Sequence, residues 1–478
     1  MDDLISLPGL IASLLLPWFV GVVFTRALLL QSGRYNWFIA IGQGYFVGIF
    51  ATTILIRLSD WIAAGLHFGR LTATLTLLGI IGVIIQLRQS APGSRPVTFL
   101  SIPLWQKTVV TVLLALLAWR YLTILQELLL RPLFAWDAWM NWAPKAIVWF
   151  HLEHLVEFVN PEQWLSQGPG LNNYTLGNME ASNYPPAVPL IQLWSMMGAG
   201  TWDHSYLFLP WFLAAVNLGL ALYGHLRLSG SSVLAATLAC YLLLSMPFLN
   251  VHTVLVGYAD IWLAATFSLA VFSLSEWHLN RSWSYGVLLL LMALFCSQLK
   301  IPGIVLAAIL ISTFIRSVIS ADHKTELVVT SGLAVLIALV LWIGVDVDTE
   351  HFGHLIFRKD FISIPVLGDY SLELHAVWGK FLDSMFVMIN WNIFWYLLAA
   401  LFVITTLRGD LFRQAAPDTL AIAAAMILIF LGLSFKEHAD RIFATLNRAL
   451  LYPIPAIIFL LFRGPLMFKC KPNSLQHL

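Results

Sequence analysis

Charged residues are scarce in this chain. Asp, Glu, Lys and Arg make up 11% of its 478 residues, whereas 59% are hydrophobic and the mean hydropathy is +0.82. A soluble domain carries about 25% charged residues, so the composition argues against a soluble enzyme and indicates a polytopic membrane protein. The formal net charge is only +1, which argues against nucleic acid as a partner.

Cysteine is equally rare. The three cysteines are scattered, and Cys240 and Cys296 lie inside apolar segments, so neither a disulfide framework nor a metal motif is indicated. The run from Asp346 to His354 has the carboxylates and imidazoles of a metal site, but their spacing matches no standard motif. We favour a solvated loop there. No cofactor is therefore predicted, and a divalent metal is the less favoured alternative.

Long apolar runs dominate the rest of the chain. A transmembrane helix needs about 20 apolar residues, and the sequence predicts an all-α polytopic membrane protein with about 13 such helices (range 12–14). The expected spans are 4–24, 37–57, 71–87, 107–130, 204–225, 231–250, 258–276, 283–299, 301–319, 326–345, 384–405, 417–434 and 442–462. The apolar piece 187–200 is short and bounded by proline, so we expect a re-entrant or interfacial helix there.

The distribution of Lys and Arg predicts the orientation. With the N-terminus outside, the cytoplasmic segments hold 14 of the 26 Lys and Arg but only 5 of the 25 Asp and Glu. This places two long loops, 131–190 and 346–383, on the outer face and the C-terminus in the cytoplasm.

The same pattern divides the chain into regions. Residues 1–106 form a three-span N-terminal extension, 107–463 a transmembrane core, and 464–478 a cytoplasmic tail. Within the core, residues 145–165 alternate apolar and charged side chains and predict an amphipathic helix at the membrane surface.

Asp137 is the first candidate for chemistry. It stands between Trp136 and Trp139 in the first outer loop, and partial desolvation there raises the basicity of a carboxylate that takes a proton from a hydroxyl. The alternative is a helix-capping acid that stabilises the helix dipole. For Trp139, Trp142 and Tyr184, stacking on sugar faces and anchoring at the interface are equally good explanations.

Charged side chains near later spans are the other candidates. Lys300 lies in a tight outer turn, where it either snorkels to headgroups or contacts a phosphate. Arg448 lies inside the last span and needs an anion, either a ligand phosphate or an acid such as Asp260 or Glu127. Arg441 is a weaker phosphate-binding candidate.

Several motifs, in this order along the chain, resemble those of the membrane glycosyltransferases with the C-type fold, a superfamily that includes the protein O-mannosyltransferases and the lipid A aminoarabinose transferase. The resemblance covers roughly residues 107–463. The motifs that carry it are Trp136-Asp137, Tyr184-Pro185-Pro186, Asp260, Lys300-x-Pro302 and Arg448-x-x-x-x-Pro453.

The resemblance implies a glycosyltransferase whose donor is a polyprenyl-phosphate-linked sugar and whose acceptor is a lipid, a glycan or a protein. Asp137 would then be catalytic. Lys300, Arg448 and Arg441 would bind the donor phosphate. The expected substrate-binding residues are Asp260, Trp139, Trp142, Lys145 and Tyr184.

The expected location is a bacterial inner (plasma) membrane, with the site facing the periplasm or exterior and a role in building cell-envelope glycans. Two other functions stay open. A polymerase or ligase of lipid-linked saccharides would place essential residues in 346–383. A transporter would show internal repeats and polar sites at the midplane, and the sequence shows no repeat.

Overall fold

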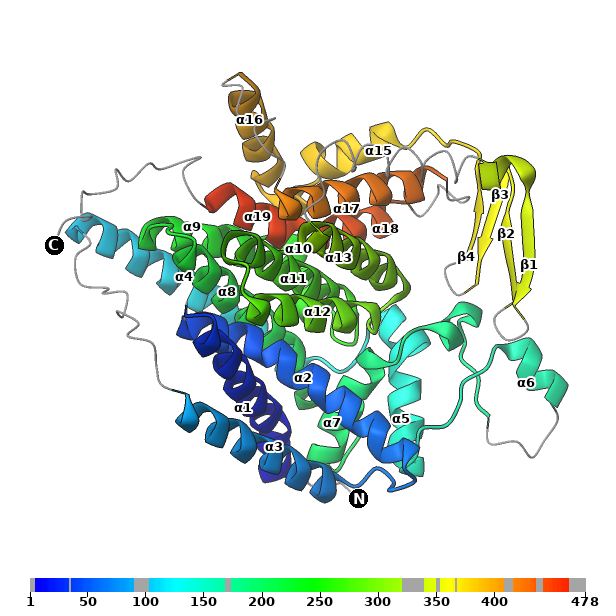
Figure 1. Ribbon diagram of the computed structural model, residues 1–478. Helices are drawn as coiled ribbons and strands as arrows, with labels where there is room; N and C mark the ends of the chain where they lie inside the picture. Colours follow the sequence, from blue (N-terminus) through cyan, green and yellow to red (C-terminus); the bar gives the residue numbers. More distant parts are fainter. Residues whose placement is uncertain are drawn as a thin grey trace.

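The computed structural model describes residues 5–33, 36–89, 103–167, 173–319, 339–349, 353–365, 368–407, 416–435 and 442–463. Helices form the body of the molecule, and a small sheet lies beside one end of it (Figure 1). The longer helices are α1 (Leu7–Gln31), α2 (Trp37–Trp61), α3 (Phe68–Arg88), α4 (Leu104–Leu130), α7 (Ala187–Ala199), α8 (Leu209–Leu228), α9 (Val233–Leu244), α11 (Asp260–Asn280), α12 (Trp283–Ser297), α13 (Ile301–Ile319), α16 (Phe394–Leu407) and α17 (Pro417–Ser434).

Shorter elements complete the described chain. They are a π-helix (Ala138–Trp142), α5 (Ala143–Leu152), α6 (Pro161–Gln167), η3 (Met179–Asn183), η4 (Ser205–Phe208), α10 (Pro247–Val254), α15 (Trp378–Leu382), a second π-helix (Asp383–Val387), η6 (Ile389–Trp391), α18 (Ile442–Leu451) and α19 (Ile454–Phe462).

Many of these helices can cross a membrane. Among the described residues, seven are long and apolar enough, and the number rises to nine if each of two bent pairs counts as one span. This confirms a helical protein with several membrane-spanning candidates. The predicted count of about 13 stays a prediction, because most of the expected span 326–345 lies outside the described residues.

Proline accounts for both bent pairs. The α9 and α10 axes differ by 59°, and the α18 and α19 axes by 41°. Pro247 begins α10, and Pro453 directly precedes α19. Proline lacks a backbone N–H and cannot continue a preceding helix, but it fits the start of a new one. The chain therefore turns at these points while each pair still runs through the bundle.

The three N-terminal helices are packed into the body. Helix α2 packs against both α1 and α8, and the α1–α2 approach is so close that a Cβ on Gly21 would lie 1.8 Å from the Gly44 carbonyl oxygen. Gln43 on α2 donates to the Ser273 hydroxyl at 3.0 Å and lies 3.1 Å from His225 Nε2. The expected N-terminal extension thus contributes polar contacts to the centre of the molecule.

Helix α7 covers the apolar piece that was predicted to be re-entrant or interfacial. Its 13 residues span about 20 Å at 1.5 Å per residue, which is too short for a hydrocarbon layer about 30 Å thick. Nearly all of its side chains are buried, and it packs against α1, α2 and α5. It is therefore an internal helix and not a full span.

The segment 131–190, predicted to be an outer loop, differs in its helices from the prediction. A single amphipathic helix was expected over 145–165, and this was wrong. Helix α5 ends at Leu152, Glu153 takes a left-handed conformation (φ +52°), and α6 begins only at Pro161. The two helices α5 and α6 lie at the same end of the body as the sheet (Figure 1), which we call the loop end.

The sheet was not predicted. Strands β1 (Val345–Thr349), β2 (Gly353–Phe357), β3 (Phe361–Ile364) and β4 (Gly368–Ser371) form an antiparallel meander in that order. Asp346 pairs with His354 at 3.1 Å and with Arg358 at 3.5 Å across it. The run that had the content of a metal site is thus part of an ion-paired β-hairpin.

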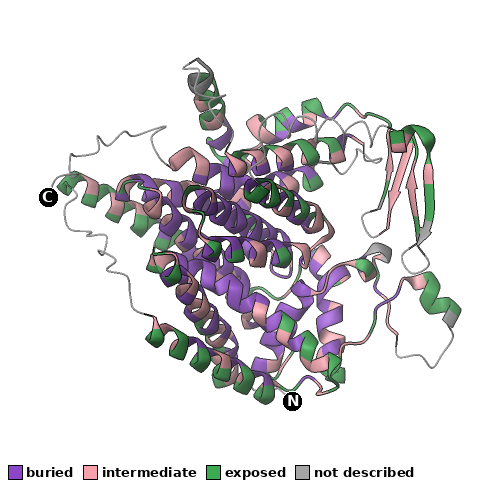
Figure 2. Ribbon diagram, viewed as in Figure 1, coloured by how far each residue is buried: buried purple, intermediate pink, exposed green. Residues whose placement is uncertain are grey.

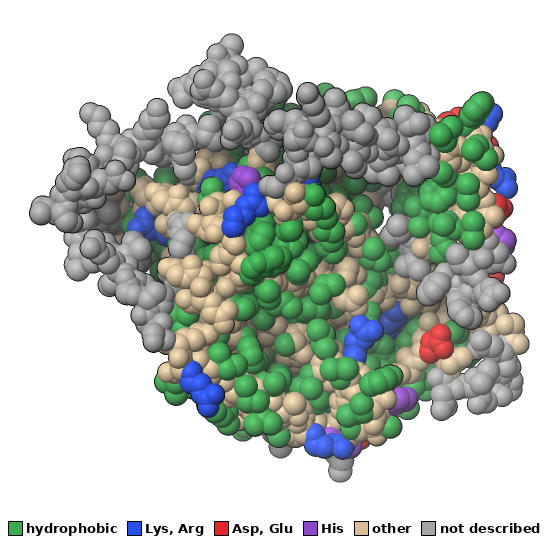
Figure 3. All heavy atoms as spheres, viewed as in Figure 1, with side chains coloured by type: hydrophobic (Ala, Val, Ile, Leu, Met, Phe, Trp, Pro, Cys, Tyr) green, Lys and Arg blue, Asp and Glu red, His purple; other side chains and the backbone are tan. Residues whose placement is uncertain are grey.

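Helix α11 is the centre of the core. Every residue from Asp260 to Trp277 is buried, and Figure 2 shows burial concentrated around this helix, with exposed side chains along α3, α4 and α16. Large apolar side chains are exposed on these outer helices, for example Trp119 at 72%. Figure 3 shows hydrophobic side chains over much of the visible face and Lys and Arg only in small groups, as expected for a surface that contacts lipid.

Candidate functional site

A buried carboxylate at the loop end holds two cations. Asp260 begins α11 and is fully buried. Its Oδ2 accepts hydrogen bonds from Arg448 Nε at 3.0 Å and Nη2 at 2.8 Å. Its Oδ1 accepts from the Tyr452 hydroxyl at 2.7 Å and from Lys300 Nζ at 3.3 Å. Both oxygens of this carboxylate therefore accept hydrogen bonds, as burial of a charge requires.

A second carboxylate joins through the same arginine. Arg448 Nη2 also donates to Asp137 Oδ2 at 2.5 Å. The Asp137 side chain makes no helix-capping hydrogen bond, although it stands at the start of the π-helix, where a carboxylate also interacts favourably with the helix dipole. We call Asp137, Asp260, Lys300, Arg448 and Tyr452 the Asp260 cluster.

Local chain geometry brings these residues together. Gly257 has φ +83°, and a Cβ there would lie 2.6 Å from Ala138 Cβ. Only glycine lets the loop before α11 approach the π-helix this closely. The next residue, Tyr258, accepts a hydrogen bond from the Asp137 backbone N–H at 3.3 Å, and its ring lies 4.9 Å from the Arg448 guanidinium.

Helical spacing and one backbone contact hold the neighbouring elements in place. Tyr452 directly follows α18 and stands four residues after Arg448, so both side chains face Asp260. The Ala187 backbone N–H donates to the Gln298 carbonyl at 3.0 Å, which ties the start of α7 to the turn that carries Lys300. Residues more than 300 positions apart in the sequence thus meet in one place.

The charges of the Asp260 cluster balance. Two carboxylates face one guanidinium and one ammonium, while the exposed fractions of their side chains range from 0% for Asp260 to 20% for Arg448. At these burials an uncompensated charge costs several kcal/mol. His252 Nδ1 lies 3.8 Å from Asp260 Oδ2 and completes the polar surroundings. Burial and the nearby Asp137 carboxylate both raise the pKa of Tyr258, so its phenol stays protonated.

A cavity of about 400 Å³ opens beside the cluster. Its polar side is formed by Asp137, Lys300, Arg448 and Tyr452, together with Asn141 and others. Much of the remaining lining is aliphatic. It comes from α13 and α17: Val305, Leu306, Ile309, Leu428, Ile429 and Leu433. The cavity therefore combines charged and hydrocarbon walls, a lining that suits an amphiphile with an anionic head.

Four of the predicted site residues line this cavity. They are Asp137, Lys300, Arg448 and Tyr184. Asp260 lies behind Lys300 and Arg448, where it positions both cations. The sequence left open whether Arg448 pairs with an acid of the protein or with a ligand. In the structure it pairs with Asp260, whereas Glu127 pairs with Arg131 at 3.0 Å.

The other predicted residues lie elsewhere. Trp139 lines a different pocket, described below. Trp142 is buried with its ring 5.2 Å from that of Tyr184. Lys145 is buried and donates to the backbone carbonyls of residues 181, 182 and 184, and burial lowers its pKa to about 8. Arg441 lies outside the described residues.

Several residues of the site were missed. Tyr452 follows Arg448 by one helical turn, a spacing that could have flagged it. Tyr258 precedes Asp260 by two residues and carried no such signal. Tyr370 on β4 also lines the cavity, and nothing in the sequence placed a strand there.

Comparisons of the chain with protein-family models, with curated proteins and with solved structures found no match. The resemblance to the C-type glycosyltransferases therefore stays a prediction from the motifs.

Proposed function

We propose that this protein is a membrane glycosyltransferase that moves a sugar from a polyprenyl-phosphate-linked donor to an acceptor hydroxyl on the extracytoplasmic face. The observation that carries the proposal is the cavity that Asp137, Lys300 and Arg448 line together with aliphatic side chains. A polyprenyl phosphate has the matching parts, because its phosphate needs cations at membrane depth and its tail needs hydrocarbon.

The cations have hydrogen-bonding capacity left for a phosphate. In the Asp260 cluster, Arg448 uses Nε and Nη2, and Lys300 makes one contact to Asp260. An ammonium has three donors and a guanidinium five. A donor phosphate would take the unused donors and would replace Asp137 at Arg448. Its arrival would release the Asp137 carboxylate toward the acceptor.

The chemical step then follows. The acceptor oxygen attacks the anomeric carbon, the bond from that carbon to the phosphate oxygen breaks, and the hydroxyl proton passes to Asp137. Polyprenyl phosphate leaves, and Lys300 and Arg448 stabilise the negative charge that develops on it. One displacement inverts the anomeric configuration. Asp260 and Tyr452 hold the arginine in place throughout.

The decisive variant is Asp137→Asn. The full chain in detergent would be given a panel of polyprenyl-phosphate hexoses and pentoses with membrane lipid extract as acceptor, and release of polyprenyl phosphate would be measured by mass spectrometry. We expect the variant to lose on the order of 10²–10⁴-fold in rate, as for other general bases. The chain should still fold, with a lower melting temperature because one of the two carboxylates that balance Lys300 and Arg448 is neutralised. The matched control is Glu157→Gln, an exposed acid of the same loop. Full activity in Asp137→Asn would refute the role of this residue.

Lys300→Ala tests the binding half of the proposal. We expect weaker binding of polyprenyl monophosphate itself, with Lys107→Ala, an exposed lysine on α4, as control. Equal affinity in both variants would favour simple snorkelling to headgroups.

One observation favours a second function, a ligase or polymerase of lipid-linked saccharides. Tyr370, from the segment where that function would place essential residues, lines the same cavity. A product in which a whole oligosaccharide is transferred, together with loss of activity in Tyr370→Ala, would support this alternative.

A further inference from the structure

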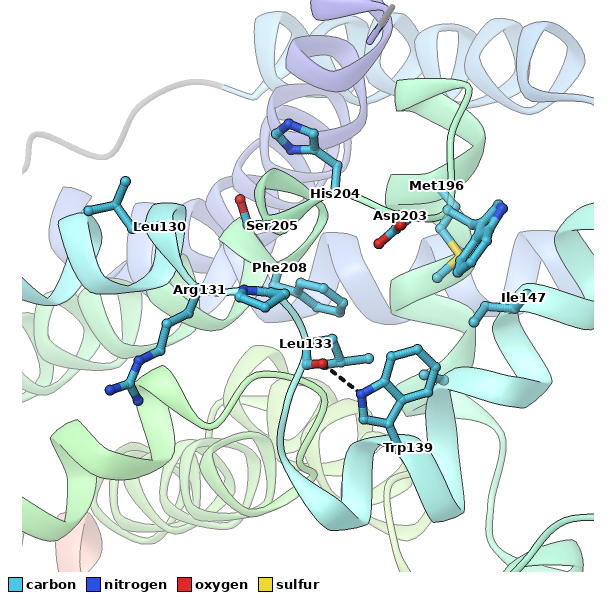
Figure 4. A pocket seen from close by; sticks show the side chains of 13 residues that line it. Leu130, Arg131, Leu133, Trp139, Ile147, Met196, Asp203, His204, Ser205 and Phe208 are labelled. Carbon is cyan, nitrogen blue, oxygen red and sulfur yellow. Dashed lines mark hydrogen bonds between the residues drawn. The ribbon is translucent and has the colours of Figure 1, made fainter. Parts of the chain in front are cut away.

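A second pocket lies on the other side of the segment that carries Asp137. Trp136, Asp137 and Asn141 line the cavity described above, whereas Leu133 and Trp139 of the same segment line a pocket of about 270 Å³ between α4, α5, α7 and η4. Figure 4 shows this pocket from close by, with the Trp139 indole N–H donating to the Leu133 carbonyl. The proposed function leaves this pocket unused.

Two tryptophan side chains and one carboxylate line this pocket. Trp139 and Trp202 are 43% and 37% exposed, so their ring faces are open to a ligand. The carboxylate of Asp203 makes no hydrogen bond to another described residue, although its backbone N–H donates to Thr201. Arg131 borders the pocket, but its guanidinium points away from Trp139 and Asp203 (Figure 4) and pairs with Glu127.

An apolar groove of about 380 Å³ adjoins the pocket. Leu130 lines both hollows, and consecutive residues of η4, Ser205 and Tyr206, line one each. The groove follows the outer face of α4, where Leu122 is 61% and Leu130 74% exposed. Helix α4 is among the least buried of the spanning candidates, so this groove faces the lipid. The pocket and the groove are thus adjacent, with Leu130 common to both, and together they are called the α4 track.

We propose that this track binds a lipid with a saccharide head, separate from the polyprenyl-phosphate donor. The acyl chains would lie in the α4 groove. The sugar ring would lie in the pocket, with its C–H face against Trp139 or Trp202 and a hydroxyl donating to Asp203. Among the described residues that line the pocket, Arg131 points away from it and no Lys is present, which disfavours an anionic head. Asp203 is exposed, so its attraction for an amine head is weak, whereas tryptophan faces suit the broad apolar face of a sugar.

A binding experiment tests this without any sugar transfer. The full chain in phosphatidylcholine nanodiscs would be titrated with glucosyl-diacylglycerol, and bound lipid would be counted by native mass spectrometry. Loss of a charge-assisted hydrogen bond or of one ring stack corresponds to about a tenfold change in affinity. We therefore expect about tenfold weaker binding in Trp202→Ala and in Asp203→Asn, and no change in the control Trp105→Ala, an exposed tryptophan at the other end of α4.

One further ligand and one further variant separate the parts of the track. Free glucose should bind far more weakly than the glycolipid, and Leu125→Trp, which fills the groove, should weaken binding of the glycolipid. Equal binding of glucosyl-diacylglycerol by all variants would mean ordinary surface lipid and would overturn the proposal. Preferential binding of phosphatidylethanolamine would also overturn it. Because no donor is present, neither result bears on the role of Asp137.

Discussion

Helix α11 carries an ion-pair cluster near each of its ends, and the two clusters differ. At its first residue, Asp260 holds Lys300 and Arg448, and the cluster opens on the 400 Å³ cavity. In its last turns, Ser275 accepts a hydrogen bond from Arg463, which forms an ion pair with the buried Asp418 of α17. The two sites lie about 22 Å apart along the helix. The second set, Ser275, Asp418 and Arg463, is called the Arg463 cluster.

The difference lies in the number of charges and in their access to a ligand. In the Arg463 cluster a single cation contacts one carboxylate, Asp418, with the buried Glu276 of α11 nearby, and these contacts tie the end of α19 to α17 and α11. The Asp260 cluster has two of each, and one guanidinium is shared between two carboxylates. Because Arg448 contacts two carboxylates, a ligand can displace Asp137 while Asp260 stays paired with the arginine. A one-to-one pair serves packing alone, whereas a shared cation can exchange a protein carboxylate for a phosphate.

Removing the charge of the buried Asp260 should lower the free energy of unfolding more than the other changes. In Asp260→Asn, two buried cations keep only Asp137 as a counter-charge, and breaking a buried pair costs about 3–5 kcal/mol. Asp418→Asn should cost less, because only one cation loses a partner and the buried carboxylate of Glu276 still acts on Arg463. Unfolding midpoints in denaturant measure both. Equal destabilisation of the two variants, or greater destabilisation of Asp418→Asn, would contradict the comparison.

Exchange of arginine for lysine should separate function from packing. Lysine keeps the charge but lacks the planar fork with which Arg448 reaches Asp260 and Asp137 together. We expect Arg448→Lys to bind polyprenyl monophosphate about tenfold more weakly, equivalent to about 1.4 kcal/mol. Arg463→Lys should bind it as the parent protein does. The same loss in both variants would show that the clusters are not functionally distinct.

The general architecture could be predicted because it depends on apolar length. Runs of about 20 apolar residues predicted the long helices. The Pro-bounded piece before Gly200 predicted a helix too short to count as a span, but not its place inside the molecule. The break after Leu152 could not be predicted, because Glu153 adopts its left-handed conformation through tertiary contacts such as the Leu66 N–H bond to its carbonyl. The sheet was missed because its strands are short and the first two contain charged residues of the run that begins at Asp346.

The sequence identified the charged members of the site and Asp260 as one possible partner of Arg448, but not the sharing of Arg448 with Asp137 or the contact between Asp260 and Lys300. Lone charges in apolar surroundings stood out, so Asp137, Lys300 and Arg448 were found. The positioning role of Asp260 depends on tertiary approach at Gly257, which no local pattern encodes. The tryptophans were ambiguous for the same reason, since Trp139 and Trp142 differ by three positions yet face a pocket and the core, respectively.

A third buried cation, Lys145, extends the comparison of buried charges, and we expect its effect on the free energy of unfolding to be the smallest. Lys145 is held by backbone carbonyls and has no carboxylate partner among the described residues, and its pKa is lowered to about 8 from the model-peptide value of 10.5. Below pH 8 the folded and unfolded states both carry the proton, and the cost of burying the charge is present in full. Between pH 8 and 10.5 only the unfolded state binds the proton, so stability rises with pH. We expect the unfolding free energy of the parent protein, relative to Lys145→Met, to increase by about 1 kcal/mol between pH 7 and pH 9. A flat difference across that range would mean that the carbonyl groups stabilise the ammonium as well as water does, and that a buried cation here needs no carboxylate.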